Sequence, residues 1–170
     1  MRPSDVNNAY YQWMNDPEVT QYLESRFATN SMDSLQEYVK NFQGDKDNIF
    51  LAIVIKENHQ HIGNIKLGPI IWFHRLADIG VMLGEKDSWG KGYASEAISL
   101  LAGHAFRTLN LHKLTAGCYE PNQGSLKAFQ KAGFEIEGIL KKHSFFRGEY
   151  VDAILLGKIN HTEKNEKETE

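Results

Sequence analysis

The sequence has 170 residues (19.4 kDa), a size that suits one domain, and its formal net charge of −3 lacks the basic excess typical of nucleic-acid-binding proteins. Hydrophobic residues make up 41%, which excludes a disordered chain, and the single cysteine excludes an internal disulfide framework and a multi-cysteine metal site. The first residues lack a signal-peptide core and no apolar run approaches about 18 residues, so we expect a cytoplasmic protein that does not bind a membrane. We also expect no nucleic-acid partner and no bound metal.

Two short helices are expected near the start of the chain. The first runs from Ser4 to Met14, where apolar side chains recur near helical spacing. The segment Asn15-Asp16-Pro17 ends it, because the residue before a proline disfavours helix. The second covers about 33–42, and Gly44 stands where a helix-terminating glycine is expected.

The rest of the chain predicts strands and helices in one mixed domain. A continuous apolar run over 49–55 indicates a buried strand, and 61–70 returns as its antiparallel hairpin partner. The further elements are a strand over 76–83, a helix over 93–109, a strand over 113–119, a helix over 122–132 and two strands over 134–146 and 150–159. This order predicts an α/β fold of mixed α+β type, with a mostly antiparallel mixed sheet flanked by helices, over 1–159. Residues 160–170 are charged and are expected to form a disordered tail.

The segment 89–97, WGKGYASEA, lies between a predicted strand and a predicted helix. Gly90 and Gly92 let backbone N–H groups converge without interference from a Cβ, and the helix starting at Tyr93 adds partial positive charge, so the segment suits phosphate oxygens. A P-loop would need Ser or Thr after Lys91, and a dinucleotide fingerprint would need a preceding parallel βαβ unit. A glycine-rich turn that only starts a helix remains the alternative.

A second helix start carries polar side chains at Asn122-Gln123-Gly124-Ser125. Asn122 follows Pro121 and makes a good N-cap. Ser125 lies at the third helical position and faces whatever the helix N-terminus faces. Capping alone is the alternative.

These two motifs in this order resemble the GNAT superfamily of acyl-CoA N-acyltransferases. The segments 89–97 and 122–134 carry the likeness, and 13–19 (WMNDPEV) and 77–83 (ADIGVML) also match. It extends from about Asp5 to Leu156 and is most specific to the branch that holds ribosomal-protein N-terminal acetyltransferases and many small-molecule and amino-sugar acetyltransferases.

The resemblance implies acetyl-CoA as the donor and no metal. The pyrophosphate would lie on the amides of Gly90 to Ala94, and the pantetheine would add like a strand beside Val81 to Leu83. Asn122 would hold the pantetheine arm, and Ser125 would approach the thioester sulfur. The expected CoA-binding residues are therefore Val81, Met82, Leu83, Trp89, Gly90, Lys91, Gly92, Tyr93, Ala94, Asn122 and Ser125.

The catalytic groups are expected to assist direct attack of a primary amine on the thioester. Many relatives place a tyrosine as proton donor to the leaving thiolate where this chain has Phe129, so we expect Ser125 to take that role, with Tyr119 as the alternative. A backbone N–H near Met82 is the candidate oxyanion donor. Asp78 is the candidate base; its alternative is a solvent-facing carboxylate at a strand end.

The acceptor is less specified by the resemblance. Glu24 could orient an ammonium and Arg26 could bind a phosphate or carboxylate, unless the two form only a local ion pair. Ribosomal-protein enzymes can carry a glutamate where this chain has Ser144, and this departure argues against a ribosomal substrate. The neighbouring His143 is a further candidate for acceptor binding, and its alternative is an exposed strand histidine.

Three functions follow from these expectations. The first is acetylation of a small-molecule amine such as a nucleotide-linked amino sugar; the others are acetylation of a protein N-terminus and a non-catalytic CoA-binding module. The family's usual first strand is expected to be short or missing, because only Met1-Arg2-Pro3 precede the first helix and a proline cannot donate to a strand ladder. The sheet edge would then be exposed or covered by a second copy in a homodimer.

Overall fold

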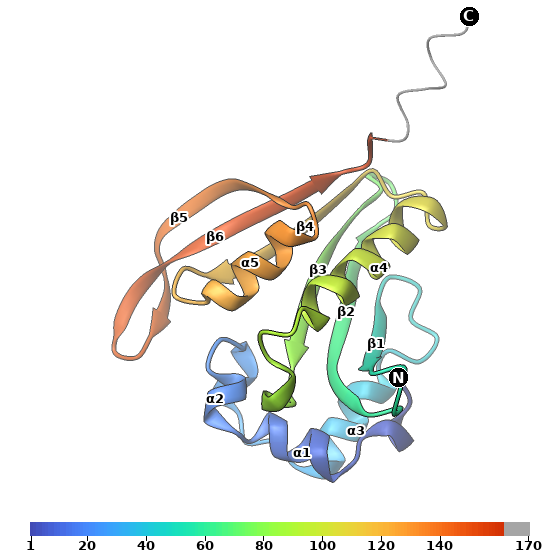
Figure 1. Cartoon of the computed structure of the whole chain (residues 1–170), viewed down its shortest axis with the longest axis vertical. Coiled ribbons are helices and arrows are strands. Elements are labelled where there is room, and N and C mark those ends of the chain that lie inside the picture. The colour runs from blue at the N-terminus through green and yellow to red at the C-terminus, as the bar shows by residue number, and fades with distance from the viewer. Residues whose placement is uncertain (162–170) are drawn as a thin grey trace, which may run out of the picture.

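The computed structural model describes residues 1–161, which form a six-stranded sheet with helices on both faces (Figure 1). In chain order the elements are η1 (Pro3–Asp5), α1 (Asn8–Met14), α2 (Pro17–Thr20), η2 (Glu24–Phe27), α3 (Met32–Lys40), β1 (Ile49–Val54), β2 (His61–Ile71), β3 (Leu76–Leu83), η3 (Lys86–Ser88), α4 (Tyr93–Arg107), β4 (Lys113–Tyr119), α5 (Gln123–Lys131), β5 (Glu135–Phe146) and β6 (Glu149–Ile159). The expected fold class, a mostly antiparallel mixed sheet flanked by helices, is confirmed.

The sheet has the strand order β1-β2-β3-β4-β6-β5, and β3 and β4 are its one parallel pair in the described residues. These two strands pair only from Leu76–Lys113 to Asp78–Thr115. Both continue beyond that point, to Leu83 and Tyr119, without pairing to each other. The sheet therefore opens into a wedge in the middle.

The alternation of side chains along the strands divides the interior into two parts. On one face, Ile65 and Ile79 pack with Ile98 of α4 and Phe129 of α5. A smaller cluster around Tyr10, Trp13, Leu35 and Val39 joins α1 and α3, and Phe50 and Met82 of the strands pack against it. In Figure 1, α4 and α5 lie in front of the strands, whereas α1 to α3 gather at the lower end. No helix in residues 1–161 is long and apolar enough to span a membrane.

The N-terminal region differs from the expected single helix over 4–14. Residues 3–5 form η1, and α1 starts only at Asn8, because the Asn7 side chain accepts a hydrogen bond from Tyr10 N at 2.9 Å and caps the helix there. Pro17, expected to end the first helix, also begins α2, since proline fits the first turn of a helix. Residues 1–7 contain no strand, as expected, and β1 is one of the two edges of the described sheet, with β5 at the other.

The expected boundary of the C-terminal tail is wrong by at least one residue. Asn160 was assigned to the tail by its sequence, but it is 7% exposed and its side-chain amide donates to the carbonyl of Leu111 at 3.2 Å. Burial and this hydrogen bond fix it to the turn before β4. Residues 162–170 of the expected tail lie outside the described residues.

Candidate active site

A cavity of about 260 Å³ occupies the wedge between β3 and β4. It brings together most of the residues expected to bind CoA. Its lining comprises Val81, Met82 and Leu83 of β3, Trp89, Gly90 and Ala94 around the start of α4, Asn122, Gly124, Ser125 and Ala128 around α5, and Glu18, Val19, Gln21, Tyr22 and Leu23 in and after α2. We call it the donor cavity.

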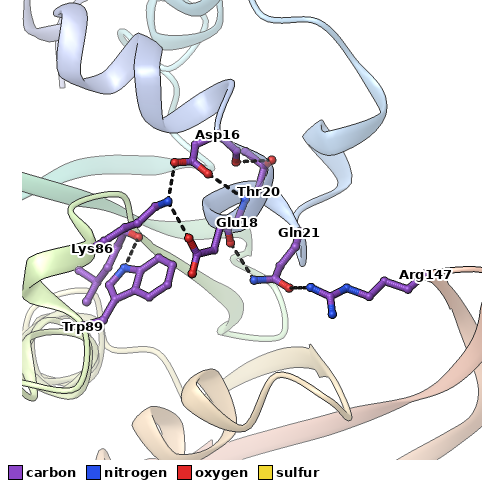
Figure 2. A network of polar contacts seen from close by, with 8 residues as sticks. Asp16, Glu18, Thr20, Gln21, Lys86, Trp89 and Arg147 are labelled. Atoms are coloured by element: carbon purple, nitrogen blue, oxygen red, sulfur yellow. Dashed lines mark hydrogen bonds and ion pairs between the residues drawn. The ribbon is translucent and has the colours of Figure 1, made fainter.

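The loop before α4 has the backbone that its glycines suggest. Gly90 has φ 73° and Gly92 has φ 90°, values that favour glycine, and a Cβ added at either position would meet no atom within 4 Å. The glycines are therefore needed for backbone conformation, and the space above them is open. Trp89 fixes the loop to the end of β3 by donating from Nε1 to the carbonyl of Leu83 at 2.9 Å (Figure 2). Lys91 and Gly92 are exposed, and neither they nor Tyr93, which packs against the main core, line the donor cavity.

The start of α5 presents an unengaged hydroxyl to the same cavity. Asn122 caps the helix by accepting a hydrogen bond from Ser125 N at 3.2 Å, and it lines the cavity as well. Within residues 1–161, no hydrogen bond engages the Ser125 hydroxyl. Asn122 therefore both caps α5 and lines the cavity, together with Ser125.

A second cavity, of about 500 Å³, lies on the α1 and α3 side of the sheet. It shares Leu23, Val81 and Met82 with the donor cavity, so the two cavities adjoin the same stretch of β3. Gly80 belongs to its lining, and a Cβ there would meet nothing within 4 Å. The remaining lining residues are Tyr10, Met14, Glu24, Ser25, Asn30, Ser34, Leu35, Tyr38, Phe50, Asn64 and Lys66. We call it the acceptor cavity.

Asp78 stands at the last paired position of β3 and β4, where the wedge opens. Its Oδ1 accepts a hydrogen bond from Thr115 Oγ1 at 3.0 Å. Partial removal from water raises the pKa of Asp78, and the Thr115 hydrogen bond and the charge of Lys66 oppose this. The carboxyl lies on the same strand face as Gly80 and Met82, although it lines neither cavity.

Tyr119, Glu24 and Arg26 form one cluster. The Tyr119 hydroxyl donates to Glu24 Oε1 and accepts from Arg26 Nη2 at 3.0 Å. Arg26 also donates to the carbonyls of Leu23 and Phe145, both at 2.9 Å, and its guanidinium lies 4.0 Å from Glu24 Oε1. The phenol proton is thus already donated, which makes Tyr119 a poorer donor to a thiolate than the unengaged Ser125.

His143 is not brought to either cavity. β5 bulges between Leu140 and Ser144, where residues 141–143 stand opposite the single residue Asp152 of β6. His143 is exposed in this bulge and lines neither cavity, as its alternative reading had it. No group of three or more His, Cys, Asp or Glu in residues 1–161 could hold a metal ion.

Ion pairs that no sequence motif indicates hold α2 over the donor cavity (Figure 2). Lys86 of η3 contacts both Asp16 Oδ2 and Glu18 Oε2 at 2.7 Å. Gln21 donates to the Glu18 carbonyl at 2.8 Å and accepts from Arg147 of the β5–β6 turn at 3.1 Å. Glu18 and Gln21 line the donor cavity, so these contacts hold the α2 segment that covers the cavity to η3 on one side and to the β5–β6 turn on the other.

Sequence reasoning also missed Asn64 and Lys66 of β2, which line the acceptor cavity. A signal for them exists in the sequence, because Asn64 and Lys66 alternate with Ile65 and Leu67 and so predict one polar face on that strand. Ser25 carries no comparable signal.

Comparisons with known proteins place this architecture in a family. Residues 1–135 match the family model described as an acetyltransferase (GNAT) domain. The uncharacterised N-acetyltransferase p20 of Bacillus licheniformis is 31% identical over 147 residues, covering 85% of this chain and 82% of p20. Spermidine N(1)-acetyltransferase of Escherichia coli K12 is 30% identical over 108 residues, covering 64% of this chain and 58% of that protein.

Solved structures share the fold over nearly the whole chain. The spermidine N-acetyltransferase of Vibrio cholerae in complex with CoA and spermine has a TM-score of 0.81 at 23% identity, covering 94% of this chain and 92% of that one. RimL, a ribosomal L7/L12 alpha-N-protein acetyltransferase in complex with coenzyme A, has a TM-score of 0.82 at 20% identity, covering 94% and 90%. With the family model matching 135 of 170 residues and p20 matching across most of both chains, the protein belongs to the GNAT family of N-acetyltransferases.

Proposed function

We propose that the protein transfers the acetyl group of acetyl-CoA to a primary amine of a small molecule by direct attack. The observation that carries this proposal is that Val81 and Met82 line both cavities. A thioester bound in one cavity and an amine bound in the other would approach each other at these residues. The family provides the reaction type, and the acceptor is our inference.

The donor cavity fits the chemistry of CoA. The start of α4 offers backbone N–H groups and an open approach above Gly90 and Gly92 for phosphate oxygens. Beyond Asp78, β3 has no strand partner on the β4 side, so Val81 and Leu83 can hydrogen-bond a pantetheine arm as a sheet edge binds a peptide. Asn122 and Ser125 line the same space from α5.

The protein groups can supply each proton step. An alkylamine is largely protonated at neutral pH, so a base must take a proton as its nitrogen bonds to the acetyl carbon. Asp78 is the proposed base, directly or through water, because its raised pKa makes it a stronger base than an ordinary aspartate. As the C–S bond breaks, the Ser125 hydroxyl stabilises the thiolate, and a backbone N–H near Met82 stabilises the oxyanion.

A ping-pong route through Cys118 is disfavoured. This thiol is 7% exposed, and burial raises its pKa, so little thiolate forms at neutral pH. It lines neither cavity. Direct attack needs no acyl-enzyme and agrees with two substrates meeting at β3.

We propose a small acceptor because the acceptor cavity, of about 500 Å³, lies between α1, α3 and the sheet, and its mainly apolar lining includes a few polar residues. Nucleotide-linked amino sugars are one candidate class. The named relatives include enzymes for spermidine and for ribosomal proteins, so the choice needs a direct test.

The test is acetyl-CoA turnover, followed by thiol release, on amino sugars, nucleotide-linked amino sugars, polyamines and peptides with free N-termini. We expect at least one small amine to exceed every peptide in kcat/KM. A preference for peptides would overturn the small-molecule proposal. Tight acetyl-CoA binding without turnover on any amine would favour the non-catalytic alternative.

A further inference from the structure

Two buried polar atoms without a partner belong to residues in the wall of the acceptor cavity. In residues 1–161, the buried side-chain nitrogen and oxygen atoms without a hydrogen-bond partner are Ser25 Oγ and Asn64 Nδ2, and neither has appreciable accessible surface. Both residues line the acceptor cavity, and Asn64 is only 4% exposed. A buried amide without a partner is unfavourable, so this wall lacks a polar contact, although a ligand would reach these two atoms only if the atoms covering them moved.

The orientation of the Asn64 amide is fixed by its neighbour. His61 Nε2 lies 2.9 Å from the carbonyl oxygen of Gly63 and 2.9 Å from Asn64 Oδ1. A carbonyl can only accept, so His61 Nε2 carries the hydrogen, and the Asn64 atom beside it must be the accepting oxygen. Nδ2, which can only donate, is therefore the atom left without a partner.

Lys66 adds a cation to the same cavity. It follows Asn64 on the same face of β2, opposite Gly80, and its Nζ lies 6.0 Å from the Phe42 ring. Within residues 1–161, no carboxylate lies within 4.0 Å of that ammonium.

The carboxylates around Lys66 are engaged elsewhere. Asp45 accepts from Asp47 N and Asn48 N in its own turn, and Asp78 accepts from Thr115. Glu24, the acidic residue of the cavity lining, bonds Tyr119 and is 78% exposed. These carboxylates reduce the positive electrostatic potential around Lys66, but none of them forms an ion pair with it.

We infer that the acceptor amine also carries an anionic group, a carboxylate or a phosphate, which binds Lys66 while the amine reaches Met82. This inference rests on the proposed transfer function and specifies its substrate class. Gly80, opposite Lys66, and Met82 lie about 7 Å apart along β3, which suits a compact molecule with separated amine and anion. A polyamine is a poor match, because its second ammonium would meet the like charge of Lys66.

The experiment compares two amines of the same chain length, 5-aminopentanoate and 1,5-diaminopentane, which differ in the charge of the far end. A third probe, 4-aminobutyl phosphate, distinguishes phosphate from carboxylate. For the wild type we expect an anionic probe to exceed the diamine in kcat/KM by about tenfold or more, the size of one charge-assisted hydrogen bond. Lys66→Met should remove this preference, Lys66→Arg should keep it, and Lys46→Met, on the exposed loop before β1, is the matched control.

The outcomes separate the inference from the proposed function. If the diamine is acetylated as well as the anionic probes, or if Lys66→Met keeps the preference, the inference is wrong and acetyl transfer stands. If no probe turns over, binding of 5-aminopentanoate to the CoA-saturated protein is measured by calorimetry. Binding that Lys66→Met abolishes would support the anion site while contradicting transfer to these amines, and absence of binding would overturn the inference.

Discussion

The sharpest test of the catalytic assignment is Ser125→Ala. The Ser125 hydroxyl bonds no residue in the described part of the chain, and the cap of α5 uses the Ser125 backbone N–H. Alanine keeps that backbone donor and suits a helix. The substitution should therefore leave the fold and CoA affinity nearly unchanged and act on the step in which sulfur gains charge.

The expected loss in kcat is about tenfold, equivalent to about 1.4 kcal/mol of transition-state free energy. Proton donation in catalysis commonly contributes about 10²–10⁴-fold, but a thiolate is a good leaving group and needs less help. The rate should be measured in a single turnover with enzyme in excess of acetyl-CoA, so that product release does not mask the chemical step.

The control is Tyr119→Phe, which removes hydrogen bonds to Glu24 and Arg26. It should cost about 1 kcal/mol of unfolding free energy, lowering Tm by roughly 2–4 °C, with little change in the single-turnover rate. If Tyr119→Phe slows the chemical step more than Ser125→Ala does, the donor is Tyr119 and our reasoning from its committed proton is wrong.

Three further changes test the other parts of the site. Gly92→Asp places a carboxylate where phosphate oxygens are expected and should weaken CoA binding by at least tenfold in calorimetry, whereas Gly148→Asp, at the matching φ of 91°, should cause similar backbone strain without that loss. Gly80→Val fills open space in the acceptor cavity, so acceptor KM should rise while CoA affinity stays the same; an unchanged KM would place the acceptor elsewhere. Asp78→Asn should lower kcat/KM by about 10²–10⁴-fold. In the pH profile of kcat/KM it should also remove the fall on the acid side, which in the wild type lies above pH 3.8. Because the folded state raises the pKa of Asp78, the wild type should lose stability as pH rises from 3.8 through that raised value, and Asp78→Asn should not; parallel Tm curves would contradict this assignment.

Most of the fold could be predicted because its elements are long and regularly patterned. The helical stripe of α4 spans enough residues to show its period. The apolar run of β1 predicted a strand correctly, but its expected burial is wrong, because β1 is an edge strand in which Leu51 and Val54 are exposed. The four-residue α2 is too short for such a pattern, and the start of α1 depends on one cap, Asn7. Asn160 was misassigned because its anchor, the Leu111 carbonyl, is distant in sequence.

The residues expected to bind CoA lie in short motifs, at the end of β3 and at the first turns of α4 and α5, and such motifs can be recognised in the sequence. The residues that cover the donor cavity, Glu18 to Leu23, come from a distant segment and carry no such motif. The acceptor cavity joins segments that are far apart in sequence, so Ser25 and Lys66 meet only once the sheet has formed. His143 lines neither cavity because it lies in a three-residue bulge, which regular strand alternation cannot anticipate.

The two-sided character of β3 has a consequence for changing the enzyme's substrate range. Ile79 is buried among the residues of the α4 and α5 core, while Gly80 lines the acceptor cavity one residue later. A library that randomises Gly80 together with Asn64 and Lys66, and leaves Ile79 fixed, would vary acceptor recognition while sparing the packing beneath it. A strand of this kind lets acceptor specificity change by single substitutions while the CoA-binding residues stay unchanged.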